Sequence, residues 1–286
     1  MPDTLPNTDT LPNTDTIAAI KLQQQTDTTV FGYDRPNVHS LLGVNIHAVT
    51  YSELCQQIDS WIFSGSPTKF CCYVNPHSVM LTFQDPDFYN ATHNADLVMA
   101  DGAGIILGSK ILGLPINKRV CGPTSMLTIL EHGQDKDFRH YFFGASVECL
   151  EKLNRNVNKK FPDVAVAGYE SPPYRQVTED ENNEMIRRIN ESGANILWVG
   201  LGAPKQEKWI ADNIERLDVN VVLGVGAAFD YHAGLVKWAP NWIRRIGLEW
   251  LYRFVQQPRR LFARNTNSVR FLLRVVLDDF IQNTTR

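Results

Sequence analysis

Asp101 is the residue whose neighbours most suggest chemistry. It follows the apolar run ADLVMA and precedes two glycines in the stretch ADLVMADGAGI, residues 95–105. An acid in this setting can be a turn residue, the ribose-binding acid of a dinucleotide site, a metal ligand or a general base. The other polar segments of the chain help to choose among these roles.

Three more apolar runs end in glycine, amide or charged residues. They lead into VNPH at 74–77, GLGAPKQE at 200–207 and GVGAAFD at 224–230. Glycine lets a ligand approach the backbone, and the start of a following helix offers free N–H groups to phosphate. Together with Asp101, these segments predict a site for a nucleotide or another phosphorylated ligand. The residues that we expect to bind it are Asn75, His77, Gly102, Lys205, Gln206 and Glu207.

A dinucleotide site does not fit the glycine spacing. Gly102, Gly104 and Gly108 form GxGxxxG instead of GxGxxG. Asp101 also precedes its glycines, whereas a ribose-binding acid follows them by roughly 20 residues. A Walker A pattern is absent too, which disfavours an ATPase.

Two DxD motifs, at 85–87 and 135–137, have the letters of a divalent-metal site. Asp85 precedes Pro86, a combination typical of a helix cap, and the second motif lies in a polar turn. Neither ends an apolar strand, and no His, Cys and acid cluster has zinc spacing. We therefore expect neither a metal nor another cofactor.

Without a metal, cationic side chains must neutralise a diphosphate. Arg119, in INKRVCGPTS, lies just before a glycine and proline turn that resembles a helix start. A planar guanidinium suits bidentate binding of phosphate. A solvated surface arginine is an equally good interpretation of this residue on sequence alone.

An alternating pattern of strands and helices must position these residues. Nearly continuous apolar strands that alternate with amphipathic helices predict a mostly parallel α/β sheet with helices on both faces. Ligands of such sheets bind beyond the carboxyl ends of the strands. The expected strands are 41–49, 69–75, 95–100, 140–145, 163–169, 195–202 and 220–226. The expected helices include 51–63, 147–161, 178–192 and 204–217.

The composition fits a chain that folds in the cytoplasm. Of 286 residues, 43% are hydrophobic, and the formal net charge is −3. The five cysteines lack CxxC spacing, which favours a reducing compartment over a disulfide framework or a structural zinc site. No uncharged apolar run approaches the ~20 residues that span a bilayer, and the polar amino terminus is no secretory signal. We expect the protein to be soluble or to lie on a membrane surface.

The two ends of the chain differ in composition from the middle. LPNTDT occurs at 5–10 and again at 11–16, so we expect 1–36 to be a disordered leader. Residues 37–236 then form the α/β domain, and 237–286 form a helical C-terminal appendage.

The C-terminal appendage is basic and aromatic. Between Lys237 and Arg274, nine cationic residues face one acid, Glu249, which gives a local charge of +8. Trp, Tyr and Phe residues such as Trp238, Trp250 and Phe262 lie among them, a pattern typical of a membrane-surface helix, whereas no nucleic-acid-reading motif occurs. A stripe spaced by three and four is typical of a packed helix face, so we expect the appendage to be part packed and part membrane-facing. The stripe consists of Val269, Leu272, Leu273, Val276, Leu277, Phe280 and Ile281.

From about residue 41 to 265 the sequence resembles the WecG/TagA/CpsF glycosyltransferases. The resemblance rests on YVN, ADLVMADGAGI, KRVCGPTSM, GLGAPKQEKWI, GVGAAFDYHAG and WAPNWIRRIGLEWLYRFVQQPRR, which follow one another in the family's order. It implies a Rossmann-like domain with a membrane-docking appendage. It also implies inverting, metal-independent transfer from a UDP-sugar to a polyprenyl-diphosphate-linked sugar at the cytoplasmic membrane face.

The same resemblance implies roles for particular residues. Asp101 matches the family's proposed base. The other matched positions are Asn75, Arg119, Gln206, Arg253 and Arg260. Tyr73 stands where many relatives have threonine, which bears on substrate specificity. A non-catalytic, membrane-docked regulator that binds a nucleotide-sugar is the alternative, and a nicotinamide oxidoreductase is a weaker one.

Overall fold

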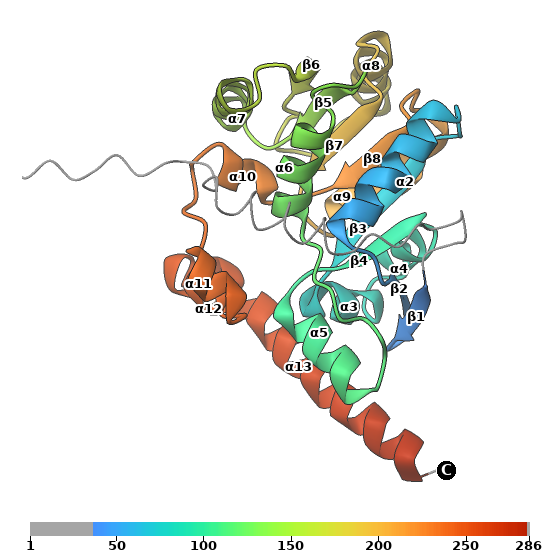
Figure 1. The fold of residues 1–286 in the computed structure, drawn as a ribbon, viewed down its shortest axis with the longest axis vertical. Coiled ribbons are helices and arrows are strands. Elements are labelled where there is room, and N and C mark those ends of the chain that lie inside the picture. The colour runs from blue at the N-terminus through green and yellow to red at the C-terminus, as the bar shows by residue number, and fades with distance from the viewer. Residues whose placement is uncertain (1–36, 285–286) are drawn as a thin grey trace, which may run out of the picture.

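The computed structural model describes residues 37–284, apart from the side chains of 245, 260, 263 and 282. The leader predicted at 1–36, with its hexamer repeat, lies outside these residues. Figure 1 shows one large sheet flanked by helices, with a long helix, α13, near the C-terminus.

The sheet has eight strands in the order β1-β2-β4-β3-β8-β7-β5-β6. Only β1 is antiparallel to its neighbour, and the remaining pairs are parallel, so the predicted mostly parallel sheet is confirmed. The strands are β1 Val38–Leu41, β2 Val44–His47, β3 Lys69–Val74, β4 Leu97–Ala100, β5 Arg139–Gly144, β6 Ala165–Glu170, β7 Ile196–Gly200 and β8 Val221–Gly224.

The single strand predicted at 41–49 is wrong, because the chain turns back inside it. Leu42 and Gly43 have φ angles of 49° and 80°, and Leu41 pairs with Val44 across the resulting hairpin. Positive φ is a conformation that glycine adopts readily, so Gly43 provides a place for the reversal. The apolar residues on either side made the run look continuous.

Helices cover both faces of the sheet, as predicted. Buried side chains of α2, α6, α7 and α10 pack on one face, and those of α3, α5, α8, α9 and α13 pack on the other. The helices are α2 Tyr51–Phe63, α3 Pro76–Thr82, α4 Pro86–His93, α5 Ala103–Ile111, α6 Gly122–His132, α7 Val147–Lys160, α8 Glu179–Glu191, α9 Lys205–Asn213, α10 Ala228–His232, α11 Asn241–Arg245, α12 Glu249–Gln256 and α13 Pro258–Thr284. A short 3-10 helix, Ile214–Arg216, follows α9.

Local capping explains where several of these helices begin. Thr50 and Thr178 each form a capping box with the glutamate three residues later, and Ser146 caps α7. Such caps satisfy N–H groups that the first turn leaves without a partner. The four helices predicted from periodicity are therefore confirmed to within a few residues.

The helix α13 packs against α3 and α5, beside which it runs in Figure 1. Phe271 and Val275 are fully buried there, and a Cβ added at Gly108 of α5 would come within 2.9 Å of the Phe271 ring. The apolar stripe that predicted a packed face lies mostly in solvent. Its exposed members are Val269, Leu273, Val276, Leu277, Phe280 and Ile281.

None of the helices between residues 37 and 284 is both long and apolar enough to span a bilayer. The longest, α13, carries cationic residues up to Arg274, among them Arg264 and Arg270.

Candidate active site

The four polar segments meet at one edge of the sheet. They follow β4, β3, β8 and β7, which are consecutive neighbours in the strand order. Because parallel strands all present their carboxyl ends at the same edge, the loops after them form one continuous rim. The predicted convergence of these segments is therefore confirmed.

Asp101 follows the last residue of β4. Its N–H donates to the Val74 carbonyl at 2.8 Å, which extends the pairing of β3 and β4 by one residue. Gly102 has a φ of 98°, so the chain can turn directly into α5. A Cβ at Gly104 would lie 2.5 Å from the Pro76 ring, so a side chain there would force the starts of α3 and α5 apart.

Arg119 is brought to Asp101 by the backbone. The Val120 N–H donates to the Ala100 carbonyl at 2.9 Å, which places Arg119 beside the end of β4. The Arg119 Nη2 lies 3.4 Å from Asp101 Oδ1 and 2.5 Å from Glu249 Oε2. The side chains of Arg119 and Asp101 are each about a quarter exposed (25% and 26%), so a ligand can reach both.

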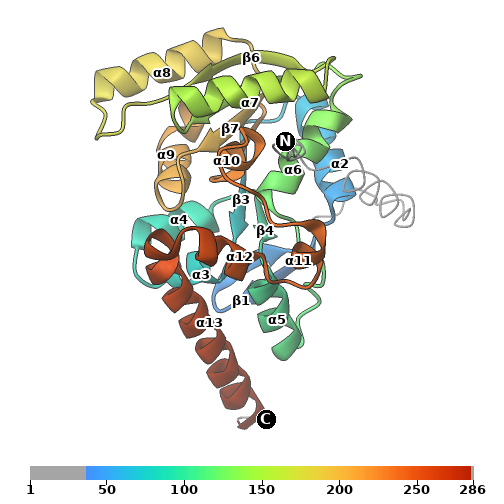
Figure 2. The ribbon, with the colours of Figure 1, turned by 90° about the vertical axis from the view of Figure 1, so that its left-hand side faces the viewer.

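The C-terminal appendage contributes directly to this site. Glu249 is the first residue of α12, which lies in front of the sheet in Figure 2, and its Oε1 accepts a hydrogen bond from Trp238 Nε1 at 2.9 Å. The Arg253 guanidinium lies 5.3 Å from the centroid of the Tyr231 ring. Arg260, the other predicted arginine, has a side chain outside the described residues.

The surroundings of Asp101 suit a proton acceptor. Burial raises the pKa of its carboxyl, and the negative charge of Glu249 acts in the same direction. The positive charges of Arg119, Arg264 and Arg253 oppose that rise without cancelling it. A carboxylate with a raised pKa binds a proton more readily, which is what general-base chemistry needs.

Several buried polar atoms near Asp101 lack a hydrogen-bond partner. Unpartnered buried groups are rare, because each one loses its hydration without compensation. Burial raises the pKa of the Tyr73 and Tyr231 phenols, and the negative charge of Asp101 acts in the same direction. In the described part of the chain, such unpartnered atoms on residues that interact with Asp101 include Tyr73 Oη, Tyr231 Oη and Arg119 Nε.

Asn75 and His77 flank the start of α3. The Asn75 Oδ1 accepts from the Ser78 N–H at 3.1 Å and so caps this helix. The His77 Nδ1 lies 3.0 Å from Nδ2 of Asn267, which is on α13. Burial, assisted by the positive charge of Arg264, lowers the pKa of His77 to about 4, so its neutral ring accepts this hydrogen bond at neutral pH.

Gln206 and Glu207 are buried at the ends of β7 and β8. The Gln206 Oε1 accepts from the Gly202 N–H at 3.1 Å, and its Nε2 donates to Glu207 Oε1 at 2.7 Å. The Gly224 backbone lies close enough for an added Cβ to come within 3.1 Å of the Gln206 amide. The Glu207 Oε2 has no hydrogen-bond partner within residues 37–284, and burial raises the pKa of this carboxyl to about 7.

Lys205 is exposed, and its Nζ lies 5.7 Å from the centroid of the Tyr174 ring. In the described part of the chain, no hydrogen bond or ion pair joins it to Asp101 or Arg119. The structure thus places Lys205 at the start of α9, outside the charged cluster.

The acids of the two DxD motifs have local roles. Asp85 accepts from the Phe88 N–H at 3.1 Å, which confirms it as the cap of α4, and it also pairs with Lys208 at 2.7 Å. Asp137 pairs with Arg139 at 2.6 Å. Over the described ranges, no group of three or more His, Cys, Asp or Glu side chains is placed to hold a metal ion.

Sequence reasoning missed three contributors to the site: Tyr231, Trp238 and Glu249. Tyr231 and Glu249 lie within the family-like segments GVGAAFDYHAG and GLEWLYR, and Glu249 stood out as the one acid in the basic stretch. A single acid among nine cations could have marked Glu249 as a functional residue, although the sequence does not indicate that its partner is Arg119.

Comparisons with known proteins agree with this architecture. The profile of the family "Glycosyl transferase WecG/TagA/CpsF family" matches residues 39–285. A relative from Bacillus spizizenii, an N-acetylglucosaminyldiphosphoundecaprenol N-acetyl-beta-D-mannosaminyltransferase, is 30% identical over 67% of this chain and 72% of its own length. Proteins of the same name from Bacillus subtilis and Staphylococcus aureus are 26% and 25% identical over 78% and 77% of this chain, and over 84% and 85% of their own. The chain belongs to the WecG/TagA/CpsF family and is a glycosyltransferase.

Proposed function

We propose that the protein transfers a sugar from a UDP-sugar to a polyprenyl-diphosphate-linked sugar, with inversion and without a metal, in exopolysaccharide or cell-surface glycan synthesis. The observation that carries this proposal is the pairing of Asp101 with Arg119 at the carboxyl edge of the sheet, 3.4 Å apart. The names of the relatives support the lipid-linked acceptor. They also make N-acetylmannosamine the first donor sugar to test, ahead of its uronic acid and of hexoses.

In the proposed reaction, Asp101 takes the proton of an acceptor hydroxyl as that oxygen attacks the anomeric carbon. The bond from this carbon to UDP breaks on the opposite face, and its electron pair leaves with the β-phosphate oxygen. Arg119 neutralises the charge that develops there, and backbone N–H groups at helix starts assist it. We assign Arg253 and Arg260 of the appendage to the same diphosphate.

The remaining predicted residues would hold the substrates in place. Asn75 and Gly102 cap the helices that follow β3 and β4, and His77 lies in the first turn of α3. Lys205, Gln206 and Glu207 lie at the start of α9, after β7, two strands beyond β3 in the sheet. Groups spread along this edge from β4 to β7 would allow a donor and an acceptor to bind next to each other.

We further propose that residues 237–286 dock on an anionic membrane surface at the cytoplasmic face. Trp242, Trp250 and Phe262 are exposed, and most of the apolar stripe of α13 is exposed as well. Each cation near an anionic leaflet contributes about 1 kcal/mol, so a few arginines would suffice to hold the protein there. Docking would place the site near a lipid-linked acceptor and would close it only on the membrane.

The test is transfer by the full-length protein to a short-chain polyprenyl-diphosphate-linked N-acetylglucosamine, with a panel of UDP-sugars and mass spectrometry of the lipid product. We expect one donor to give a product. Asp101→Asn should lower its formation by about 10²- to 10⁴-fold while UDP-sugar binding persists. Asp96→Asn is the matched control, because Asp96 precedes the same strand, is similarly exposed at 29%, and pairs with Lys69 at the opposite edge.

A non-catalytic regulator would bind the UDP-sugar and form no product with any donor. An oxidoreductase would be stabilised by NAD instead of UDP, which a thermal shift measurement detects. Cleavage of the chain near residue 236 should abolish transfer to the lipid acceptor; full transfer by the shortened protein would contradict closure of the site by the appendage.

A further inference from the structure

Glu249 makes the stronger of the two contacts with the Arg119 guanidinium. Both its contact and that of Asp101 are made to the same nitrogen, Nη2, at 2.5 Å and 3.4 Å respectively. The shorter distance is typical of a strong charge-assisted hydrogen bond, whereas the longer one lies beyond the usual range. Asp101 is therefore only weakly paired, although a cation lies directly beside it.

The neighbouring side chains hold the Glu249 carboxylate in this position. Its side chain is only 12% exposed, and its second oxygen accepts from Trp238 Nε1 at 2.9 Å. The Trp238 ring stacks on that of Tyr231 at 5.6 Å, and the Arg244 guanidinium covers it at 4.1 Å. A carboxylate fixed by two donors from different segments is positioned, and its contact with Arg119 is not a chance surface pair.

Burial alone would raise the pKa of Glu249, but the charge and hydrogen bond of Arg119 and the bond from Trp238 outweigh it and lower the pKa. Glu249 is therefore ionised at neutral pH. A lasting negative charge at this point changes the balance around Asp101.

We propose that Glu249 is a positioning residue that holds the Arg119 guanidinium away from Asp101, so that the Asp101 carboxylate stays available to take the proton of the acceptor hydroxyl. This inference rests on the proposed function. Since Glu249 begins α12, the base is complete only when the appendage is docked on the α/β domain.

The charges that face Asp101 support this role. Three cations act on it from separate elements: Arg119 before α6, Arg253 on α12 and Arg264 on α13. The phenols of Tyr73 on β3 and Tyr231 on α10 also face it, and burial keeps both protonated at neutral pH. The negative charge of Glu249 opposes the effect of these cations on the pKa of Asp101. Without it, Asp101 would pair with Arg119 and become a weaker base.

The test is the pH profile of kcat/KM for the full-length protein and for Glu249→Gln, with the active UDP-sugar and lipid acceptor. Glutamine keeps one oxygen to accept from Trp238, and it removes the negative charge and the second oxygen, which accepts from Arg119. We expect the acid limb of the profile to move to lower pH by about one unit and the plateau of kcat to fall about tenfold, with little change in donor KM. Glu191→Gln, on the exposed surface of α8, removes the same charge elsewhere and should leave the acid limb unmoved.

A second variant guards against misfolding. Trp238→Phe removes one of the two bonds to Glu249 without a change in charge, and should move the acid limb in the same direction by a smaller amount. Lower activity of Glu249→Gln with an unmoved acid limb would reduce Glu249 to a structural contact and overturn the inference. Absence of any product from the wild-type protein would instead reject the proposed function, so the two failures are distinguishable.

Discussion

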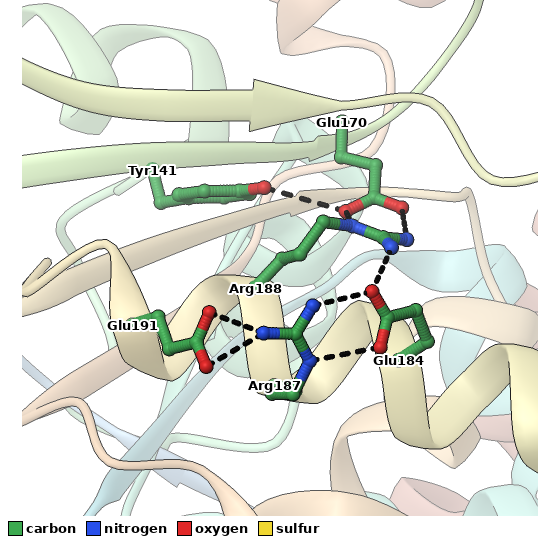
Figure 3. Close-up of polar contacts among 6 residues, drawn as sticks. All are labelled: Tyr141, Glu170, Glu184, Arg187, Arg188 and Glu191. Carbon is green, nitrogen blue, oxygen red and sulfur yellow. Dashed lines mark hydrogen bonds and ion pairs between the residues drawn. The ribbon is translucent and has the colours of Figure 1, made fainter.

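Within residues 37–284, arginine and carboxylate side chains form one cluster at the candidate site and another on the surface of α8. There Arg187 bonds to Glu184 and Glu191, and Arg188 bonds to Glu184 and, across to β6, to Glu170 (Figure 3). The Arg187 side chain is 53% exposed and that of Glu191 is 60% exposed. Most of these partners are three or four residues apart on one helix, which is a local arrangement.

The other cluster joins Asp101, Arg119 and Glu249, and it is built differently. Its members are separated by 18 and 130 residues in the sequence, and their side chains are 12% to 26% exposed. Exposed ion pairs contribute little to stability, whereas charges withdrawn from water are expensive unless they remain paired. The same types of side chain therefore affect stability differently in the two clusters. The cluster at the site forms only in the folded chain, because its members are far apart in the sequence.

Removal of Arg119 should give the largest effect of any single change in either cluster. Arg119→Met leaves Asp101 and Glu249 facing each other without the cation that pairs them, so we expect a loss of about 3 kcal/mol in the free energy of unfolding. Because both carboxyl pKa values then rise, this loss should shrink as the pH is lowered. Urea unfolding at neutral and acidic pH measures it, together with transfer activity. An unchanged unfolding free energy would mean that the buried cluster behaves like the exposed one.

Glu207 tests the same contrast, because its carboxylate has no cationic partner at hydrogen-bond distance among the described side chains. Burial raises its pKa to about 7 from an ordinary 4.5, so the folded state holds the proton more tightly than the unfolded state. Wild-type stability should then fall as the pH rises from 4.5 to 7, by on the order of 2 to 3 kcal/mol. Glu207→Gln does not titrate, so above pH 7 it should be more stable than wild type by that amount.

Urea unfolding of both proteins at about pH 5 and about pH 8 measures this difference. The exposed carboxylate variant Glu191→Gln serves as the control and should show no comparable dependence on pH. Equal stability of Glu207→Gln and wild type at the higher pH would contradict the burial argument for Glu207.

Much of the α/β domain could be predicted because its signals are local. Periodicity located most of the strands and several helices, and the expected parallel arrangement placed the loops after β3, β4, β7 and β8 at one edge of the sheet without knowledge of any side chain. Asp85, before Pro86, marked the start of α4. The hairpin at Gly43 was missed because apolar residues continue on both sides of the glycine.

The appendage could not be predicted to the same depth, because its contacts join distant segments. The helix α13 has two apolar faces, and the face with Phe271 and Val275 is the one that packs. It can pack because Gly108 of α5 has no side chain to collide with the Phe271 ring. Which face packs depends on the shape of a partner about 160 residues away. The contact of Glu249 with Arg119 likewise arises only once α12 has docked.

His77 offers a moderate test of how firmly the appendage is docked. Its folded pKa of about 4 lies below the ordinary 6.5, so the docked state disfavours the protonated ring. The stability of docking is complete above pH 6.5 and is lost as the pH falls toward 4. After correction for intrinsic rates, amide exchange in α13 around Asn267 should increase by on the order of tenfold between neutral pH and about pH 5, a figure reduced for partial solvent exposure.

His77→Gln, which does not titrate, should lose this pH dependence, while exchange in α8 should be unaffected in both proteins. Exchange in α13 that is independent of pH in the wild-type protein would show that the bond between His77 and Asn267 does not hold the helix in place.

The smallest effect should come from Arg187, whose partners Glu184 and Glu191 are hydrated whether or not it is present. Arg187→Gln should leave the unfolding midpoint unchanged at physiological salt, where screening acts over about 8 Å, and any loss at low salt should disappear when salt is added. Salt should not rescue Arg119→Met. The loss of stability in Arg188→Gln should lie between those of Arg187→Gln and Arg119→Met, because the Glu170 carboxylate that loses its partner is only 17% exposed. If the three variants ranked by the number of bonds removed, with Arg187→Gln the most damaging, then burial would not be what separates the two clusters.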